Sequence, residues 1–359
     1  MDYAGRQRRA AEAIQKTHID VLLVTHLPNI QYLSGFTGSA AILVFAGERW
    51  TLFTDGRYAE QARAQVRGAR VVIAKGPVLT AAANWLSKRQ SGVVGIEAEQ
   101  MTVSYRSALK RLLHSNTRVR ETRTIVEQLR VIKDPSELAL IRKSVNLGCK
   151  LLDPAIRALK PGVPEIRVAA EIEYAARKGG ASGMSFETIV AAGARSALPH
   201  GVASDAAIPR KGFVVMDFGV ILAHYCSDMT RTVHVGRVPP VNRRVYDAVR
   251  DAQQAAIDAV GPGVAIGQVD AAARRVLKRA GLAKYFTHST GHGVGLEIHE
   301  QPRIASGIKE VLLPGMVITI EPGAYLPGQG GVRIEDMVLV TERGCDVLTR
   351  ATKELIVID

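Results

Sequence analysis

The stretch FVVMDFGVILAHYCSDMTRTVHV, residues 213–235, contains two apolar runs that each include a carboxylate. Each run has the length and the β-branched content of a buried strand. A hairpin centred on Leu222–Ala223 would place Asp217 of the first run directly opposite Asp228 of the second, on one face of the pair. Because Leu-Ala is a poor tight turn, we expect a connection of more than two residues.

Two further carboxylates and one imidazole occur in similar patterns later in the chain. Glu321 ends the apolar run GMVITIEPG, and Glu335 lies in GGVRIEDMVLV, two residues after Arg333 and therefore on the same face of that strand. His292 lies in HSTGHGVGLEIHE, where glycines at alternate positions leave room for backbone to crowd a site. A regular strand would place His292 and His299 on opposite faces, so a turn or bulge must separate them if both serve one site.

Buried carboxylates are costly unless they are paired, protonated or bound to a metal. Any one of these four carboxylates could be a partly exposed residue at a strand end. Four of them with one imidazole form an oxygen-rich donor set that suits two divalent ions of the manganese, cobalt, iron or zinc kind.

The first third of the chain alternates strand and helix patterns. An amphipathic helix over 6–16 precedes the buried strand IDVLLVTH, and AAILVFAG with RWTLFTDGRY indicates a hairpin that turns near Gly47. Strands are expected at RVVIAKG and GVVGIEA, with helices over 78–89 and 104–114. We therefore predict an α/β domain over residues 1–124.

The remaining residues, 125–359, read as a second domain of the α+β class. Asp-Pro-Ser-Glu is typical of a helix start and begins a predicted long helix over 134–159. A second helix is expected over 164–179 and ends at a Gly-Gly pair. The chain then becomes rich in strand patterns, with helices near 244–260 and 268–280.

Composition limits the class of protein. The chain has 359 residues, of which 47% are hydrophobic and 23% charged, which excludes collagen-like, coiled-coil and disordered chains. No apolar run approaches the ~18 residues of a membrane span, and the first residues lack the apolar core of a secretory signal. The three cysteines form no C-x-x-C pair, so we expect neither a disulfide framework nor a thiolate zinc site. A reducing cytoplasm is the simplest location.

The net charge of +13 is concentrated in the first domain, where 18 Lys and Arg face 9 Asp and Glu. A basic domain suits nucleic acid. The basic residues are however scattered singly along predicted helices, without interleaved aromatic residues for stacking. A solvated basic surface is therefore the preferred interpretation.

The motifs of the second domain, in their order, resemble those of the pita-bread metallopeptidases, and within them the proline-specific branch of Xaa-Pro dipeptidases (prolidases) and Xaa-Pro aminopeptidases. YLSGFTGSAA and FTDGRY resemble the non-catalytic N-terminal domain of that branch, so the likeness spans nearly the whole chain. Methionine aminopeptidases share the catalytic fold but lack such a domain. The motifs of the second domain are LPHG, VVMDFG, SDMTRT, STGHGVG, IHE, EPGAY and VRIED.

The resemblance implies a two-metal site. Asp217 would bind one ion, His292 and Glu321 the other, and Asp228 and Glu335 would bridge the pair. Manganese is the first choice, with cobalt, zinc and iron as alternatives. Two such ions lower the pKa of a shared water toward ~7, which supplies a nucleophile at neutral pH.

The resemblance also assigns catalytic residues around the metals. Glu321 would carry a proton from the nucleophile to the leaving nitrogen. His200 and His299 would donate hydrogen bonds to the scissile region. Arg333 either braces Glu335 or acts closer to the substrate. Arg195 stands where many relatives have Asn, which leaves the segment before His200 undefined.

Three residues are candidates for substrate binding. Tyr325, in the EPGAY motif, and Phe186 either line a proline pocket or pack in the core. Arg303 lies four residues after His299, and in some prolidases an arginine at this spacing binds the carboxylate of a dipeptide. The alternative is a surface arginine. The expected substrates are short proline-containing peptides, and a homodimer is the family expectation.

Two other functions remain as alternatives. A pita-bread protein could bind a partner through its basic domain without cleaving anything. Such a protein would be expected to lose metal ligands, and this chain has all five ligands that the resemblance implies. A creatinase-like hydrolase needs no metal, and the presence of Asp217, Asp228 and Glu335 disfavours it.

Overall fold

The computed structural model describes residues 1–89 and 92–359, which form two compact units, Met1–Arg130 (the N-terminal unit) and Val131–Asp359 (the C-terminal unit). The division falls after Arg130 rather than at the expected 124/125 boundary. Helix α6 (Ile125–Arg130) packs within the N-terminal unit, where the Arg130 guanidinium donates to Asn29 Oδ1 at 2.8 Å. This buried hydrogen bond explains why the last helix of the unit stays with it.

The N-terminal unit is a six-stranded mixed sheet in the order β4-β3-β2-β1-β5-β6 with helices on both faces. Every element predicted for this part is present, and α2, α3, α6 and β6 are additional. Its strands are β1 (Val21–Val24), β2 (Ala41–Ala46), β3 (Arg49–Asp55), β4 (Ala69–Ala74), β5 (Val93–Glu97) and β6 (Arg118–Thr122). Its other helices are α1 (Tyr3–Gln15), α2 (Leu27–Ser34), α3 (Ala59–Gln65), α4 (Val78–Ser87) and α5 (Val103–Leu112).

The four central strands of this sheet, β1, β2, β3 and β5, are almost entirely buried on both sides, as their continuous apolar runs predict, whereas the edge strands β4 and β6 are partly exposed. Val21 and Leu23 of β1 face α4 and α5, while Leu22 points to the opposite face. The β2–β3 hairpin turns at Gly47–Glu48, where both residues have positive φ, the conformation of a two-residue type I′ turn. The predicted hairpin near Gly47 is confirmed.

The C-terminal unit holds four small sheets flanked by helices. Its sheet orders are β20-β12-β9-β8, β14-β13-β15-β18-β19, β11-β10-β7 and β16-β17. Its helices are α7 (Pro135–Lys150), α8 (Leu152–Ala158), α9 (Glu165–Lys178), α10 (Pro240–Asp258) and α11 (Ile266–Arg279). Its strands are β7 (Gly183–Met184), β8 (Ile189–Ala192), β9 (Gly212–Phe218), β10 (Val220–Leu222), β11 (Tyr225–Cys226), β12 (Met229–Val235), β13 (Gly291–Gly293), β14 (Glu300–Ile304), β15 (Val317–Ile320), β16 (Gly323–Leu326), β17 (Gly330–Arg333), β18 (Asp336–Val340), β19 (Cys345–Val347) and β20 (Val357–Ile358).

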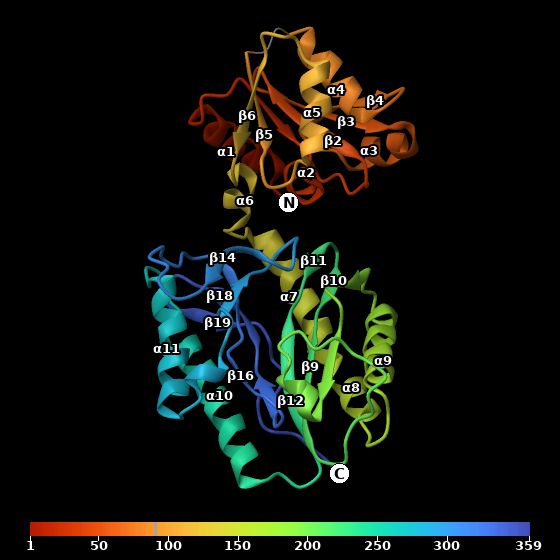
Figure 1. The fold of residues 1–359 in the computed structure, drawn as a ribbon. Helices are drawn as coiled ribbons and strands as arrows, with labels where there is room; N and C mark the ends of the chain where they lie inside the picture. Colours follow the sequence, from red (N-terminus) through yellow and green to blue (C-terminus); the bar gives the residue numbers. More distant parts are fainter. Residues whose placement is uncertain (90–91) are drawn as a thin grey trace. The chain divides into compact units, whose positions relative to one another are not determined.

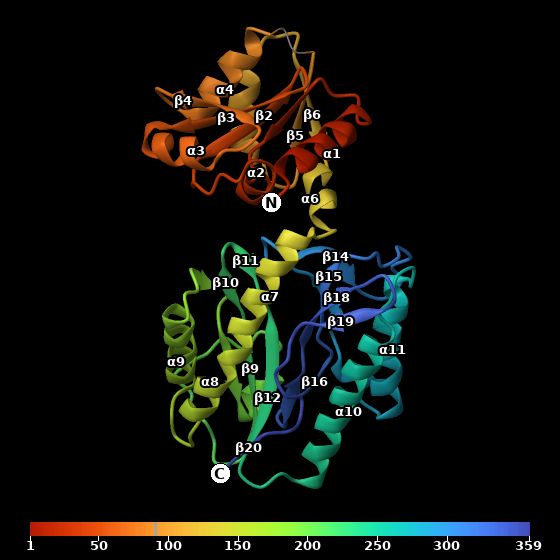
Figure 2. The same ribbon diagram turned by 180° about the vertical axis from the view of Figure 1, so that it is seen from behind.

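Two helix pairs cover the C-terminal unit on opposite flanks (Figures 1 and 2). Helices α8 and α9 share a core with β8, β9 and β12, whereas α10 and α11 share another with β15, β17 and β18. The buried side of α10 repeats at helical spacing, for example at Val245, Val249 and Ala252. The strands between the two flanks supply the acidic and imidazole side chains of interest.

The predicted long helix over 134–159 is wrong in one respect: it is two helices. Helix α7 begins at a capping box formed by Asp134 and Glu137, which confirms the predicted start. It ends at Lys150, and α8 follows after Leu151. Pro154 explains the break, because it offers no N–H to the Lys150 carbonyl and its ring would press against that carbonyl.

Within the described ranges, no helix is both long enough and apolar enough to cross a membrane.

Candidate metal centre

Asp217 lies in β9 and Asp228 directly precedes β12, the antiparallel partner of β9, and the prediction that they stand directly opposite each other is wrong. The Cα partner of Asp217 is Thr230, so Asp228 lies diagonally, on the same face and just before β12. The hairpin turns at Ala223–His224, both with positive φ, rather than at a longer loop around Leu222–Ala223. The fully buried strands set this register, and the turn residues adopt the left-handed conformation that it requires.

Arg333 connects Asp217 to its surroundings. Its Nη2 donates to Asp217 Oδ2 at 2.6 Å, and Nε donates to the Thr230 hydroxyl at 3.0 Å. Its Nη1 donates to the Tyr325 hydroxyl at 2.7 Å and to the Pro199 carbonyl at 2.9 Å. The other oxygen of Asp217, Oδ1, is buried without a hydrogen-bond partner among the described residues.

A turn between β13 and β14 brings His292 and His299 together. The register shifts after His292, and the two ring centroids lie 4.4 Å apart. A Cβ on Gly293 would lie 2.1 Å from the Gln301 carbonyl oxygen, so no side chain fits there. The predicted irregularity between the two histidines, and the need for glycine beside them, are confirmed.

Glu321 and Glu335 come from the ends of neighbouring strands. Glu321 directly follows β15, and its backbone N–H donates to the Thr290 carbonyl at 2.8 Å. Glu335 lies between β17 and β18 and is only 2% exposed. Its Oε2 accepts a hydrogen bond from the Thr230 hydroxyl at 2.7 Å. Thr230 therefore links Glu335 to Arg333. The single strand predicted through these two residues is wrong, because residues 334–335 separate β17 from β18.

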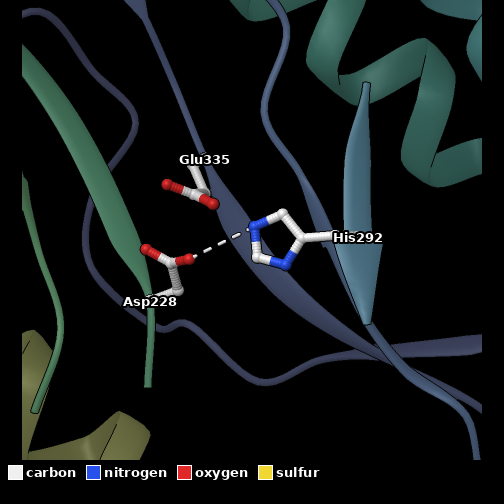
Figure 3. Close-up of side chains that lie close together, drawn as sticks. All are labelled: Asp228, His292 and Glu335. Carbon is white, nitrogen blue, oxygen red and sulfur yellow. Dashed lines mark ion pairs between the residues drawn. The ribbon is translucent and has the colours of Figure 1, made fainter. Parts of the chain in front are cut away.

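Three of the predicted ligands converge. Side chains of Asp228, His292 and Glu335 point toward one another from three different segments (Figure 3), and one donor atom of each lies within 4.8 Å of the others. His292 Nε2 lies 3.6 Å from Asp228 Oδ2 and 3.6 Å from Glu321 Oε1. The centre thus joins residues that are more than 100 positions apart in the chain.

Burial dominates the electrostatics of the centre. It raises the pKa of Glu321 to about 8 and raises the pKa of Asp228 and of Glu335 well above the ordinary value, with further contributions from the neighbouring carboxylates. Burial also lowers the pKa of His292 to about 4, so this imidazole is neutral at pH 7. Without a cation, carboxylates so close together hold protons that they would otherwise release.

This donor set fits divalent cations. Several buried carboxylate oxygens converge, and Asp217 Oδ1 has no hydrogen-bond partner among the described residues. His292 Nδ1 lies 3.0 Å from the Gly293 carbonyl oxygen, to which it donates its proton. Nε2 is then the unprotonated nitrogen, directed at the carboxylates, which is the usual arrangement of a metal-binding histidine.

Other predicted residues surround this centre to different extents. His200 is exposed and follows Pro199, whose carbonyl is bound by Arg333. His299 is exposed as well, although burial against the surrounding protein and the nearby His200 lower its pKa. Arg303 is exposed, and its Cα pairs with that of His292, so both side chains leave the same face of the β13–β14 pair.

Tyr325 is buried and does more than pack: its hydroxyl lies 2.9 Å from His288 Nε2 and accepts from Arg333. Phe186 is half-buried. It follows Ser185, whose hydroxyl donates to the Ser227 carbonyl at 2.9 Å, next to Asp228.

Sequence reasoning missed His288 and Thr230. Burial lowers the pKa of His288 to about 4, and its ring contacts Tyr325. Its position four residues before His292 in HSTGH was a signal for it. Thr230 lies in SDMTRT, but a buried threonine in a strand gives no chemical signal until its partners Glu335 and Arg333 are known.

Comparison with known proteins gives two domain matches. Residues 139–342 match the model of metallopeptidase family M24, and residues 6–132 match the creatinase/prolidase N-terminal domain. A curated Xaa-Pro dipeptidase of Pyrococcus horikoshii is 37% identical over 350 residues, which cover 97% of this chain and 98% of the relative.

Solved structures agree in fold over almost the full length. A structure named Xaa-Pro dipeptidase from Bacillus anthracis has a TM-score of 0.96 at 38% identity and covers 99% of this chain and 100% of its own. An X-Pro aminopeptidase from Thermotoga maritima has a TM-score of 0.88 at 32% identity, covering 97% and 100%. The predicted fold, an α/β creatinase/prolidase-type domain before an α+β pita-bread domain, is confirmed, and the chain belongs to metallopeptidase family M24.

Proposed function

We propose that this metallopeptidase is a prolidase: it binds two divalent cations and hydrolyses the Xaa-Pro bond of dipeptides. The observation that carries the proposal is that one donor atom each of Asp228, His292 and Glu335 lies within 4.8 Å of the others. The chain that holds this cluster belongs to a metallopeptidase family. Relatives at 37% identity over nearly the whole chain are named Xaa-Pro dipeptidases. Manganese is the first choice of metal, with cobalt, zinc and iron as alternatives.

The five proposed ligands divide by position. Asp228 and Glu335, the most buried carboxylates of the cluster, would bridge the two cations. Asp217 would bind one cation, and His292 with Glu321 the other. Bound divalent cations polarise a carbonyl and lower the pKa of a coordinated water. Four carboxylates suit such a pair of cations because their four negative charges balance the four positive charges of the pair.

Residues around the metals would move protons and hold the substrate. Glu321 is the most exposed of the carboxylates near His292, with 17% of its side chain accessible, and would carry a proton to the leaving imide nitrogen. His200 and His299 would donate hydrogen bonds to the scissile carbonyl and to the oxyanion that develops from it. Arg333 would act indirectly on catalysis, by holding Asp217 and Tyr325 in place.

Arg303 is the proposed reason for a preference for dipeptides. The carboxylate of a dipeptide ends at proline and so lies beside the scissile bond, close to the metals. Arg303 is exposed and leaves the same strand-pair face as His292, where it can meet that carboxylate. Tyr325 and Phe186 would contact the proline ring, whose fixed shape costs little entropy to recognise.

We also propose a homodimer in the cytoplasm, with short proline-containing peptides as substrates and no nucleic-acid partner. The basic side chains of the N-terminal unit would then face solvent.

Metal analysis together with hydrolysis tests the proposal. Protein loaded with Mn²⁺ should cleave Xaa-Pro dipeptides, lose activity in chelator and recover on readdition of metal. A preference for Xaa-Pro-Yaa over Xaa-Pro would instead favour an aminopeptidase. Cleavage that survives chelation would favour a creatinase-like hydrolase, and metal binding without cleavage of either peptide would favour the binding protein.

A further inference from the structure

The segment that carries His200 is a loop, residues 193–204, that leaves β8 through a 3₁₀ turn, Gly193–Ala197, and returns to β8 in a bridge between Ile189 and Val202. His200 lies near the middle of this loop and is exposed. The position of the His200 side chain therefore depends on the contacts that fix the loop backbone before and after it.

On the side of the metal centre, two hydrogen bonds anchor the loop. The Ser196 hydroxyl accepts from the Gly331 N–H at 2.8 Å, and the Pro199 carbonyl accepts from Arg333 at 2.9 Å. Both anchors come before His200 in the chain. They leave the position of the residues after His200 to other contacts.

Arg195 supplies contacts on the far side. Its Nη2 donates to the Val202 carbonyl at 2.8 Å, so one guanidinium joins the backbone before His200 to the backbone after it. Its Nε lies 3.0 and 3.2 Å from the two carboxylate oxygens of Glu165. The Arg195 side chain is 35% exposed, whereas that of Glu165 is fully buried.

Glu165, the first residue of α9, holds both ends of the loop. Its carboxylate accepts from the Ala192 N–H at 2.8 Å, just before the loop begins. It also accepts from the Ser204 hydroxyl at 2.8 Å and the Ser204 N–H at 3.2 Å, where the loop ends. Each of these partners, like Arg195, is a donor. An ionised carboxylate therefore satisfies the site, whereas the amide group of Gln would place a donor against donors.

We propose that Glu165 and Arg195 are positioning residues that hold the His200 loop in its working place; this inference rests on the role proposed for His200. Together they close the loop at its two ends and across its middle. This role accounts for an arginine at position 195, which the sequence left undefined. The planar fork of the guanidinium directs Nε at Glu165 and Nη2 at the Val202 carbonyl, so it fixes the position of this carbonyl relative to the carboxylate.

A double-mutant cycle tests the coupling to catalysis. We expect Arg195→Gln to lower kcat/KM for an Xaa-Pro dipeptide about 10- to 100-fold, mainly through kcat, with unchanged metal content. In a His200→Ala background, Arg195→Gln should have little further effect, because the side chain that it positions is gone. Arg195→Lys, which keeps the charge but not the fork, should recover part of the loss. Arg167→Gln removes the same charge from the exposed side of α9 and serves as the control.

Hydrogen exchange gives a readout that does not depend on turnover. Amides of residues 193–204 should exchange faster in Arg195→Gln than in Arg167→Gln, while those of α10 remain unchanged. Equal exchange rates in the two variants would overturn the inference. It would also be overturned if Arg195→Gln lowered kcat/KM by the same factor in the His200→Ala background as in the wild type. If wild-type protein cleaves no Xaa-Pro peptide, or His200→Ala cleaves it normally, the proposed function or the role of His200 fails, and the exchange comparison alone decides whether Arg195 holds the loop.

Discussion

The Arg333 guanidinium lies 2.6 Å from Asp217 Oδ2, while Asp217 Oδ1 is buried with no partner in the described parts of the chain. One oxygen of the carboxylate is thus oriented by Arg333, and the other accepts no hydrogen bond from the described residues. The same guanidinium holds Tyr325 and the Pro199 carbonyl. Arg333 therefore connects Asp217, a proposed metal ligand, to two other segments of the C-terminal unit.

Replacing Arg333 should weaken metal binding without abolishing it. Arg333→Lys keeps the charge but cannot bind Asp217, Tyr325 and Pro199 at once. Loss of such an orienting partner typically lowers metal affinity or activity about 10- to 100-fold. Titration of metal-free protein with Mn²⁺ measures this, and Arg243→Lys, in an exposed pair on α10, is the control. Unchanged affinity in Arg333→Lys would mean that Asp217 needs no such support.

Asp228→Asn should abolish activity and reduce the bound metal. A bridging carboxylate offsets charge on both cations, which an amide cannot do. Elemental analysis and a dipeptide assay on the same preparation give the result, beside Asp251→Asn, an exposed residue of α10. Full activity with full metal content would remove Asp228 from the centre.

His299→Ala should keep the metals and lose turnover. Its ring lies 4.4 Å from that of His292, and loss of one donor to a developing oxyanion typically costs ~10²–10³ in rate. Metal analysis separates the two effects, with His114→Ala in the N-terminal unit as the control. A variant that lacks metal would make His299 a ligand instead.

Arg303→Ser should distinguish dipeptides from longer peptides. A charge-assisted hydrogen bond contributes roughly 1.5–3 kcal/mol, or about 10–150-fold in kcat/KM, and only a dipeptide offers its carboxylate at this place. We expect that loss for Xaa-Pro and little change for Xaa-Pro-Yaa. Arg275→Ser, exposed on α11, controls for charge. Equal losses on both peptides would favour an aminopeptidase.

The stabilising effect of metal should grow with pH. The pKa of Glu321 is raised from 4.5 to about 8, so the free energy of unfolding of metal-free protein falls as pH rises through this range. The pKa values of Asp228 and Glu335 are also raised, and they change stability in the same direction. The pKa of His292 is lowered to about 4, so its contribution is instead lost as pH falls below 6.5.

Cations remove the carboxylate penalty and compete with protons, so the Tm increase on adding Mn²⁺ should be larger at pH 8 than at pH 5. Thermal denaturation with metal and with chelator across this range provides the measurement. A Tm increase that does not depend on pH would show that the carboxylates are already ionised without metal.

The sequence alone determined the order of elements and the chemical character of the centre. Carboxylates in apolar runs are costly unless they are paired, protonated or bound to a metal, so the set of Asp217, Asp228, Glu321 and Glu335 with His292 favoured a metal site. Local patterns also placed the two domains, the Gly47 hairpin and the start of α7. These features depend on residues close together in the chain, and the periodicity of apolar residues predicts such local helices and strands.

Only the tertiary structure decided how these residues meet. The register of β9–β12 is set by packing on both faces, which a weak turn such as Ala223–His224 follows rather than directs. Thr230 contacts Glu335, about 100 positions away, and His288 contacts Tyr325, about 40 positions away. The roles of both residues follow from these contacts. Likewise, Arg195 was an unexplained residue in a motif until the fold placed Glu165 beside it. Contacts between distant segments carry no periodic signal in the chain, so the folded packing alone assigns them.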